Sequence, residues 1–168
     1  LVVYINGVAD ATTATSSSAV YNSDRGLSIG AYASNTYSLD GYLDGFRISK
    51  EARYTSTFTP STTAFTDDIN TALLLNADIN QGTYNPDTST GLAISTDSRM
   101  KFDGTGDYLT VPDSSDWAFG TDNFTVEFWM NHQSVATGNV GITFSPTADH
   151  RQIFGYVDAG DGLFKIYL

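Results

Sequence analysis

The chain has 168 residues and a mass of 18.1 kDa, the size of one globular domain or of two incomplete ones. Apolar residues make up 40% and aromatic residues 13%, a content that excludes a wholly disordered chain. The formal net charge of -11 would repel phosphate groups, so we expect no binding to nucleic acid. We also expect no membrane insertion, because no apolar run approaches the roughly 18 residues that a spanning helix needs.

The composition favours strands over helices. Asp supplies most of the acidic residues and Glu occurs only twice, while Thr, Ser and Gly are abundant. Asp, Ser and Gly favour turns, and Thr, Tyr and Phe fit a pleated sheet. Cysteine is absent, which excludes disulfides, thiolate metal sites and cysteine nucleophiles. The composition therefore predicts an all-β protein with many polar turns.

Alternating hydrophobicity places the expected strands in chain order. The first, residues 1–5, runs into Asn6 and Gly7, a dipeptide that favours a type I′ hairpin turn. The clearest strand is 124–130, in which Glu127 and Trp129 point away from the more apolar face. One helical turn is predicted at 50–54, and the low-complexity stretch 11–18 is expected to be an edge strand or a loop. The other predicted strands are 27–31, 42–49, 72–75, 107–111, 141–144, 152–157 and 163–168.

Two long motifs are similar to parts of a known family. Residues 39–60 read LDGYLDGFRISKEARYTSTFTP, and residues 100–120 read MKFDGTGDYLTVPDSSDWAFG before the strand at 124–129. The chain resembles the laminin-G-like (LamG) repeats of the concanavalin-A-like superfamily, found in tandem in bacterial surface proteins and phage tail fibres. The resemblance implies an antiparallel jelly-roll β-sandwich.

The order of the two motifs departs from the family pattern. The resemblance assigns residues 1–66 to the closing half of one LamG-like unit and residues 72–168 to the opening half of a following unit, with a linker at 67–71. The family's Trp-His pair before its central strand has no counterpart. Both ends of the chain fall within strand patterns, which predicts an excerpt from a longer polypeptide or a permuted arrangement. We therefore expect either the junction of two tandem repeats or one permuted sandwich, completed by a neighbouring unit or by a copy of itself.

Acidic loop residues suggest a metal site. Ca²⁺ takes six to eight oxygen ligands, which Asp-rich and Gly-rich loops supply. Four Asp residues flank one predicted strand, and the resemblance, which includes many Ca²⁺-binding domains, places two more beside them. The predicted structural Ca²⁺ site consists of Asp40, Asp44, Asp103, Asp107, Asp113 and Asp116. The alternative is that these residues form turns through local backbone hydrogen bonds.

The sequence offers no catalytic constellation, so we expect no enzyme. Glu127 lacks a partner carboxylate at strand spacing and is expected on a solvent face. His132 and His150 lie on polar segments without metal-ligand or triad spacing. Exposed aromatic rings could stack on sugars, whereas Trp129 is expected in the core or between units. The candidate rings in polar stretches are Tyr21, Tyr32, Tyr37, Tyr84 and Trp117.

These observations predict a non-enzymatic module at an extracellular, virion or bacterial cell surface. Its expected partners are a cell-surface glycan or receptor, bound weakly by loops at one end of the sandwich, and neighbouring LamG-like units. Repetition in a fibre would strengthen such binding. Two alternatives stay open: a structural spacer or decoration protein with no ligand, and an accessory carbohydrate-binding module of a secreted polysaccharide-degrading enzyme.

Overall fold

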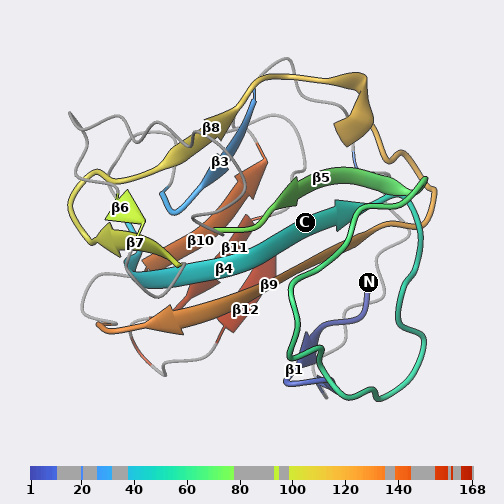
Figure 1. The fold of residues 1–168 in the computed structure, drawn as a ribbon, viewed down its shortest axis with the longest axis horizontal. Helices are drawn as coiled ribbons and strands as arrows, with labels where there is room; N and C mark the ends of the chain where they lie inside the picture. Colours follow the sequence, from blue (N-terminus) through green and yellow to red (C-terminus); the bar gives the residue numbers. More distant parts are fainter. Residues whose placement is uncertain are drawn as a thin grey trace.

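The computed structural model describes residues 1–10, 20, 26–31, 38–77, 93–94, 99–134, 139–144, 154–158, 160 and 164–167. This part of the chain forms two five-stranded antiparallel sheets and one separate hairpin (Figure 1). Its one helical element is a short 3-10 turn, η1 (Ser115–Trp117). The prediction of an all-β chain is therefore confirmed for the described residues.

The first sheet joins strands from both ends of the sequence. Its order is β12-β11-β10-β3-β8. β3 (Leu27–Ile29) pairs with β10 (Asn139–Phe144) on one side and with β8 (Leu109–Val111) on the other. β11 (Phe154–Val157) and β12 (Phe164–Tyr167) complete the sheet. A strand from the first third of the chain thus lies between two strands from its second half.

The second sheet is built around β4 (Asp40–Ser49). β9 (Thr125–His132) pairs along one edge of β4. The other edge is shared, because β7 (Met100–Asp103) pairs with the first half of β4 and β5 (Thr71–Leu75) with its second half. β6 (Ala93–Ile94) lies outside β7. In Figure 1, β4 runs between β5 and β9, with β10 and β11 behind it.

A bulge in β4 keeps its apolar residues facing inward. Leu43 and Phe46 are both fully buried although they are three positions apart, an odd spacing in a strand, because Gly45 is an extra residue in the pairing with β9. Gly45 has a φ of 55°, the left-handed conformation that glycine adopts without strain. Side chains from both sheets then meet in one buried cluster that includes Leu27, Ile29 and Phe102.

Burial confirms the predicted alternation of 124–130. Phe124, Val126, Phe128 and Met130 pack against the buried cluster. Phe128 stacks on Phe46 with ring centroids 5.8 Å apart. Apolar contact between the two sheets is the main source of the stability of the fold.

The Asn6–Gly7 turn is also confirmed. β1 (Tyr4–Ile5) and β2 (Val8–Ala9) form a two-stranded hairpin, and both turn residues have a positive φ, 52° for Asn6 and 79° for Gly7. The hairpin contacts the segment that follows β4, since the Phe58 amide donates to the Gly7 carbonyl at 2.9 Å. The Tyr4 and Phe58 rings meet edge to face with centroids 5.5 Å apart.

Most other predicted strands agree with observed ones to within a few residues, and β2, β6 and β7 are additional. The predicted helical turn at 50–54 is wrong, because these residues form a bend without helical structure. Two backbone amides there are taken by distant partners: Lys50 donates to the Asn70 carbonyl and Arg53 to the Thr125 hydroxyl. The stretch 11–18 lies outside the described residues.

Candidate functional site

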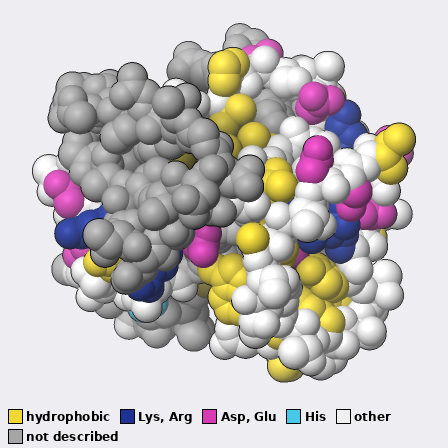
Figure 2. Space-filling view, viewed as in Figure 1, with side chains coloured by type: hydrophobic (Ala, Val, Ile, Leu, Met, Phe, Trp, Pro, Cys, Tyr) yellow, Lys and Arg dark blue, Asp and Glu magenta, His cyan; other side chains and the backbone are white. Residues whose placement is uncertain are grey.

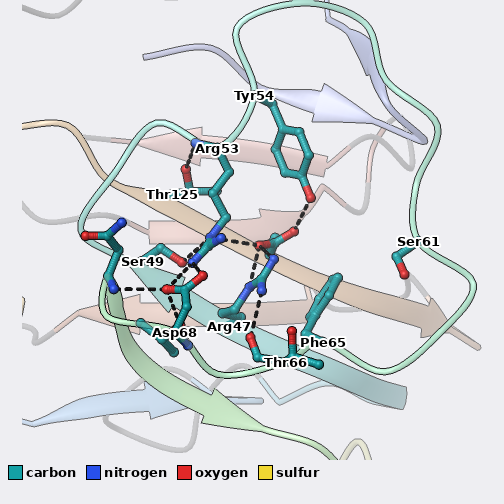
Figure 3. A network of polar contacts seen from close by, with 12 residues as sticks. Arg47, Ser49, Arg53, Tyr54, Ser61, Phe65, Thr66, Asp68 and Thr125 are labelled. Carbon is teal, nitrogen blue, oxygen red and sulfur yellow. Dashed lines mark hydrogen bonds and ion pairs between the residues drawn. The ribbon is translucent and has the colours of Figure 1, made fainter.

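The outer face of the β4–β9 pair carries a polar network centred on Glu127 (Figure 3). Arg47 donates through Nε to Glu127 Oε1 at 2.7 Å, and its Nη2 lies 2.6 Å from the same oxygen. The Tyr54 hydroxyl donates to the other oxygen, Oε2, at 2.7 Å. Only 12% of the Glu127 side chain and 9% of the Arg47 side chain are exposed. The expectation that Glu127 faces solvent is therefore wrong.

The segment between β4 and β5 covers this face. The Arg47 guanidinium donates to the Thr66 carbonyl at 3.1 Å and lies 4.5 Å from the centroid of the Phe65 ring. Tyr54, from the same segment, stacks on Phe58. Residues 51–70 thus connect two strands of one sheet while lying across the outside of that sheet, which removes Glu127 from water.

Arg53 fixes the two ends of the covering segment. Its Nη2 donates to both carboxylate oxygens of Asp68, at 2.9 and 2.8 Å, and its Nη1 lies 3.0 Å from Glu51 Oε1. Its Nε donates to the Ser49 hydroxyl at 2.6 Å. Because both Glu127 oxygens and the Arg53 nitrogens already have partners, the network acts as a brace for the outer face.

The network raises the pKa of Tyr54 to about 12, through burial first and then through its hydrogen bond to Glu127. A raised pKa means that the phenol stabilises the fold below its unfolded value near 10 and stops doing so as the pH rises through about 12. We predict that ultraviolet titration detects a tyrosine ionisation step near pH 12, and that Tyr54→Phe removes that late step. A late step that persists in Tyr54→Phe would contradict this assignment.

Trp129 lies on the same outer face, outside the area that residues 51–70 cover. It pairs with Asp44 in the register of β4 and β9, and 41% of it is exposed. Trp129 therefore does not lie in the core, and its expected alternative, a place between units, stays a prediction. A Cβ atom built on Gly45 would meet Trp129 Cδ1 at 3.4 Å and Phe65 Cε2 at 3.3 Å. The missing side chain at Gly45 lets the two rings flank one point of the strand.

Three of the six predicted calcium ligands gather at the start of β4. Asp40 pairs with Asp103 in the register of β4 and β7, and the Asp103 amide donates to Asp107 Oδ2 at 2.8 Å. Asp107 is fully buried, and its Oδ1 has no hydrogen-bond partner among the residues that the structure describes. Burial, with the neighbouring Asp103 carboxylate as a further cause, raises the pKa of Asp107.

The other three predicted ligands lie apart from this corner. Asp44 is four residues further along β4 and accepts from the Gly45 amide at 2.7 Å. Asp113 is exposed after β8. Asp116 forms an ion pair with Lys50, which follows the opposite end of β4 and holds the pKa of that carboxyl below its usual range. Within the described residues, no three His, Cys, Asp or Glu side chains are grouped to hold a metal ion.

The remaining sequence candidates add little to the site. His132 is exposed at the end of β9. His150, Tyr21, Tyr32, Tyr37 and Tyr84 lie outside the described residues, as does the side chain of Trp117.

Comparisons with known proteins found no match: no family model fits the chain, and neither a search of curated proteins nor one of solved structures returned a similar entry. Among the residues that the structure describes, no helix has the length and hydropathy needed to cross a membrane.

Proposed function

We propose that this chain is a LamG-like jelly-roll module that acts in adhesion, without enzymatic activity, at an extracellular, bacterial or virion surface. Two antiparallel sheets around one buried cluster support the sandwich. The pairing of β3 with β8 and of β4 with β7 and β9 supports the permuted arrangement, in which residues 1–66 and 72–168 complete one body.

The observation that carries the adhesive role is the exposed ring of Trp129 on an outer sheet face. An indole ring is a large rigid contact surface that loses little conformational entropy on binding. Its flat face matches the C–H face of a pyranose, so a cell-surface glycan is the proposed ligand. Binding through one such ring is weak, and repetition along a fibre would strengthen it.

A glycan array probed with the protein clustered on beads tests this role. The proposal predicts binding to at least one glycan class when the protein is multivalent. No binding to any glycan under these conditions would contradict the adhesive role and favour a spacer without a ligand.

We also propose that the corner formed by Asp103 and Asp107 holds a structural Ca²⁺ ion. Oδ1 of buried Asp107 supports this, because a buried carboxylate oxygen without a partner among the described residues is costly and a cation would offset that cost. The Asp103 carboxylate is the oxygen ligand next to it.

Calcium is therefore expected to stabilise the protein. At a concentration about 100 times its dissociation constant, Ca²⁺ adds about 2.7 kcal/mol to the free energy of unfolding, which raises the melting temperature by about 5–10 °C. Asp107→Asn should abolish that shift. Without Ca²⁺ the variant should melt no lower than wild type at neutral pH, because the raised pKa of Asp107 means that its ionisation weakens the fold as the pH rises. An unchanged melt of the chelated wild type on adding Ca²⁺ would contradict the site.

A further inference from the structure

The edge of β9 that faces away from β4 is the longest open strand edge in the described part of the protein. β9 has eight residues, whereas the other strands at the margins of the two sheets, β5, β6, β8 and β12, have five, two, three and four. In Figure 1, β9 lies at the margin of its sheet, on the side of β4 away from β5. It contains no proline and no lysine, the residues with which proteins usually protect such an edge. Another strand can therefore add here.

Backbone groups along this edge have no partner among the described residues. The Gln133 amide donates to the Asp40 carbonyl at 2.7 Å, so the odd-numbered residues of β9 direct their backbone groups toward β4. The even-numbered residues direct theirs away from β4, and no hydrogen bond joins these groups to any residue that the structure describes. The even-numbered residues are Val126, Phe128, Met130 and His132. The edge thus offers N–H donors and C=O acceptors at the spacing of an extended chain, which selects a β-strand as its partner.

The edge carries no net charge, although the chain is strongly acidic. Figure 2 shows acidic side chains scattered over this side of the molecule, and the chain has a net charge of -11. β9 contains one acidic side chain, Glu127, which the Arg47 guanidinium neutralises at 2.6 Å, and no lysine or arginine. The charged residues Asp44 and Lys101 belong to β4 and β7, one and two strands further from the edge. A second copy of the chain can therefore approach β9 without the repulsion that it would meet at an acidic surface.

The backbone of β9 is complementary to itself about Trp129. In an antiparallel pair related by a two-fold axis at this residue, Val126 lies opposite His132 and Phe128 lies opposite Met130 of the second copy. All the residues with outward backbone groups then have partners. An axis at any other residue of β9 leaves at least one of them without a partner in the strand.

The same register also matches the side chains. Trp129 lies opposite its own counterpart, and two aromatic rings in direct cross-strand contact attract each other. Glu127 lies opposite Asn131, so no two like charges face each other across the pair. A second copy thus meets the requirements of this edge in backbone, side chains and charge.

We infer that β9 pairs with β9 of a second copy of this chain, antiparallel and about a two-fold axis at Trp129, so that one continuous sheet crosses the dimer. Trp129, 41% exposed in the single chain, then lies between two units. The dimer presents two indole rings next to each other on one outer face, where the single chain presents one. This inference goes beyond the adhesive role and does not rest on it, since it follows from the edge of β9.

The mass of the full chain in solution tests the pairing, by analytical ultracentrifugation over a range of concentrations. Wild type should associate to twice its mass of 18.1 kDa. Trp129→Lys should raise the dissociation constant of the dimer about tenfold or more, because it removes the ring pair and sets two like charges opposite each other. Val8→Lys, the same kind of change at another exposed apolar residue, is the matched control and should dimerise like wild type. Thermal melts of both variants exclude unfolding as the cause of a lost dimer.

Single-cysteine variants test the register, because the chain contains no cysteine of its own. Trp129→Cys should form a disulfide-linked dimer in the presence of an oxidant, since directly opposite residues of an antiparallel pair lie within reach of a disulfide. Asn131→Cys lies on the same face of the same strand, but its counterpart would be about 13 Å away along the pair. It should therefore crosslink much more slowly than Trp129→Cys.

Three results would overturn the inference. The first is a wild-type chain that stays monomeric at a concentration of about 1 mM. The second is a dimer that Trp129→Lys does not weaken, and the third is crosslinking of Asn131→Cys as fast as that of Trp129→Cys. Glycan binding by the clustered protein is measured separately, so its absence would contradict the adhesive role and leave the dimer standing.

Discussion

Replacing Glu127 with alanine should lower the free energy of unfolding by about 3–5 kcal/mol, because it leaves the Arg47 guanidinium buried without its counterion. Tyr54 loses its acceptor in the same step, and the covering segment loses a contact on which it depends. Urea unfolding followed by tryptophan fluorescence measures the loss. Only 9% of the Arg47 side chain is exposed, so its guanidinium is already largely removed from water and the full cost of an unpaired charge is expected.

The ion pair between Lys50 and Asp116 is the matched control. Both side chains are about half exposed, at 48% and 49%. Asp116→Asn should therefore cost no more than about 1 kcal/mol, the usual limit for a surface pair. Equal losses for Glu127→Ala and Asp116→Asn would contradict the view that the covering segment makes the Glu127 network a buried one.

Replacing Gly30 with alanine should lower the free energy of unfolding by about 2–5 kcal/mol. Gly30 has a φ of 90°, and a Cβ atom there would lie 2.2 Å from Cε1 of Phe102, which belongs to the other sheet. The cost is the sum of backbone strain at a positive φ and overpacking of the core. Chemical denaturation again measures it, with the slope of the transition checked for two-state behaviour.

Gly106 separates the two contributions. Its φ is 80°, close to that of Gly30, but a Cβ atom there would meet nothing within 4 Å. Gly106→Ala should thus cost only about 1–2 kcal/mol of backbone strain. Gly30→Ala should lower the free energy of unfolding by more than Gly106→Ala does. This difference should shrink in a Phe102→Leu background, because a smaller side chain leaves space for the new methyl group. Equal losses for Gly30→Ala and Gly106→Ala, or a difference that Phe102→Leu leaves unchanged, would contradict the packing of the two sheets at this point.

The strands could be predicted because their signal is local. In 124–130 the apolar period of two residues is enough to identify the buried face, and the Asn6–Gly7 pair has the backbone preference that its hairpin requires. The start of β8 was predicted two residues early, at Asp107, because that residue continues the polar and apolar alternation but instead turns its carboxylate to the Asp103 amide.

The environment of the outer face could not be predicted in the same way. Alternation correctly places Glu127 opposite the apolar face, but it does not say whether another segment covers that face. The side chains that bind Glu127 lie far from it in sequence: Tyr54, in the covering segment, is 73 residues away, and Arg47, on β4, is 80 residues away. The sequence does contain a hint of the network, because Arg47, Arg53 and Glu127 would each need a charged partner if buried. Nothing in the local sequence, however, indicates that they are partners of one another. For Trp129, likewise, alternation does not say whether its face is covered: the core is excluded, and a place between units stays a prediction.

Only some of the predicted calcium ligands lie close together, because strand pairing decides which of them are neighbours. Resemblance and spacing together brought six Asp residues into one predicted site, whereas the register of β4 and β7 unites only Asp40 and Asp103, with Asp107 beside them. Asp116 is bound to Lys50 at the far end of a ten-residue strand, a distance that spacing along the chain does not reveal. Strand pairing, not sequence separation, decides which carboxylates are neighbours.

The central claim is that the outer face of the β4–β9 pair binds a glycan at Trp129, and two-dimensional NMR of the isotope-labelled protein tests it most directly. Titration with an oligosaccharide selected on the array should shift the indole N–H signal of Trp129, the exposed ring on that face. Signals from the β1–β2 hairpin should stay in place. Shifts confined to loops at the ends of the sheets, with Trp129 unchanged, would contradict the account.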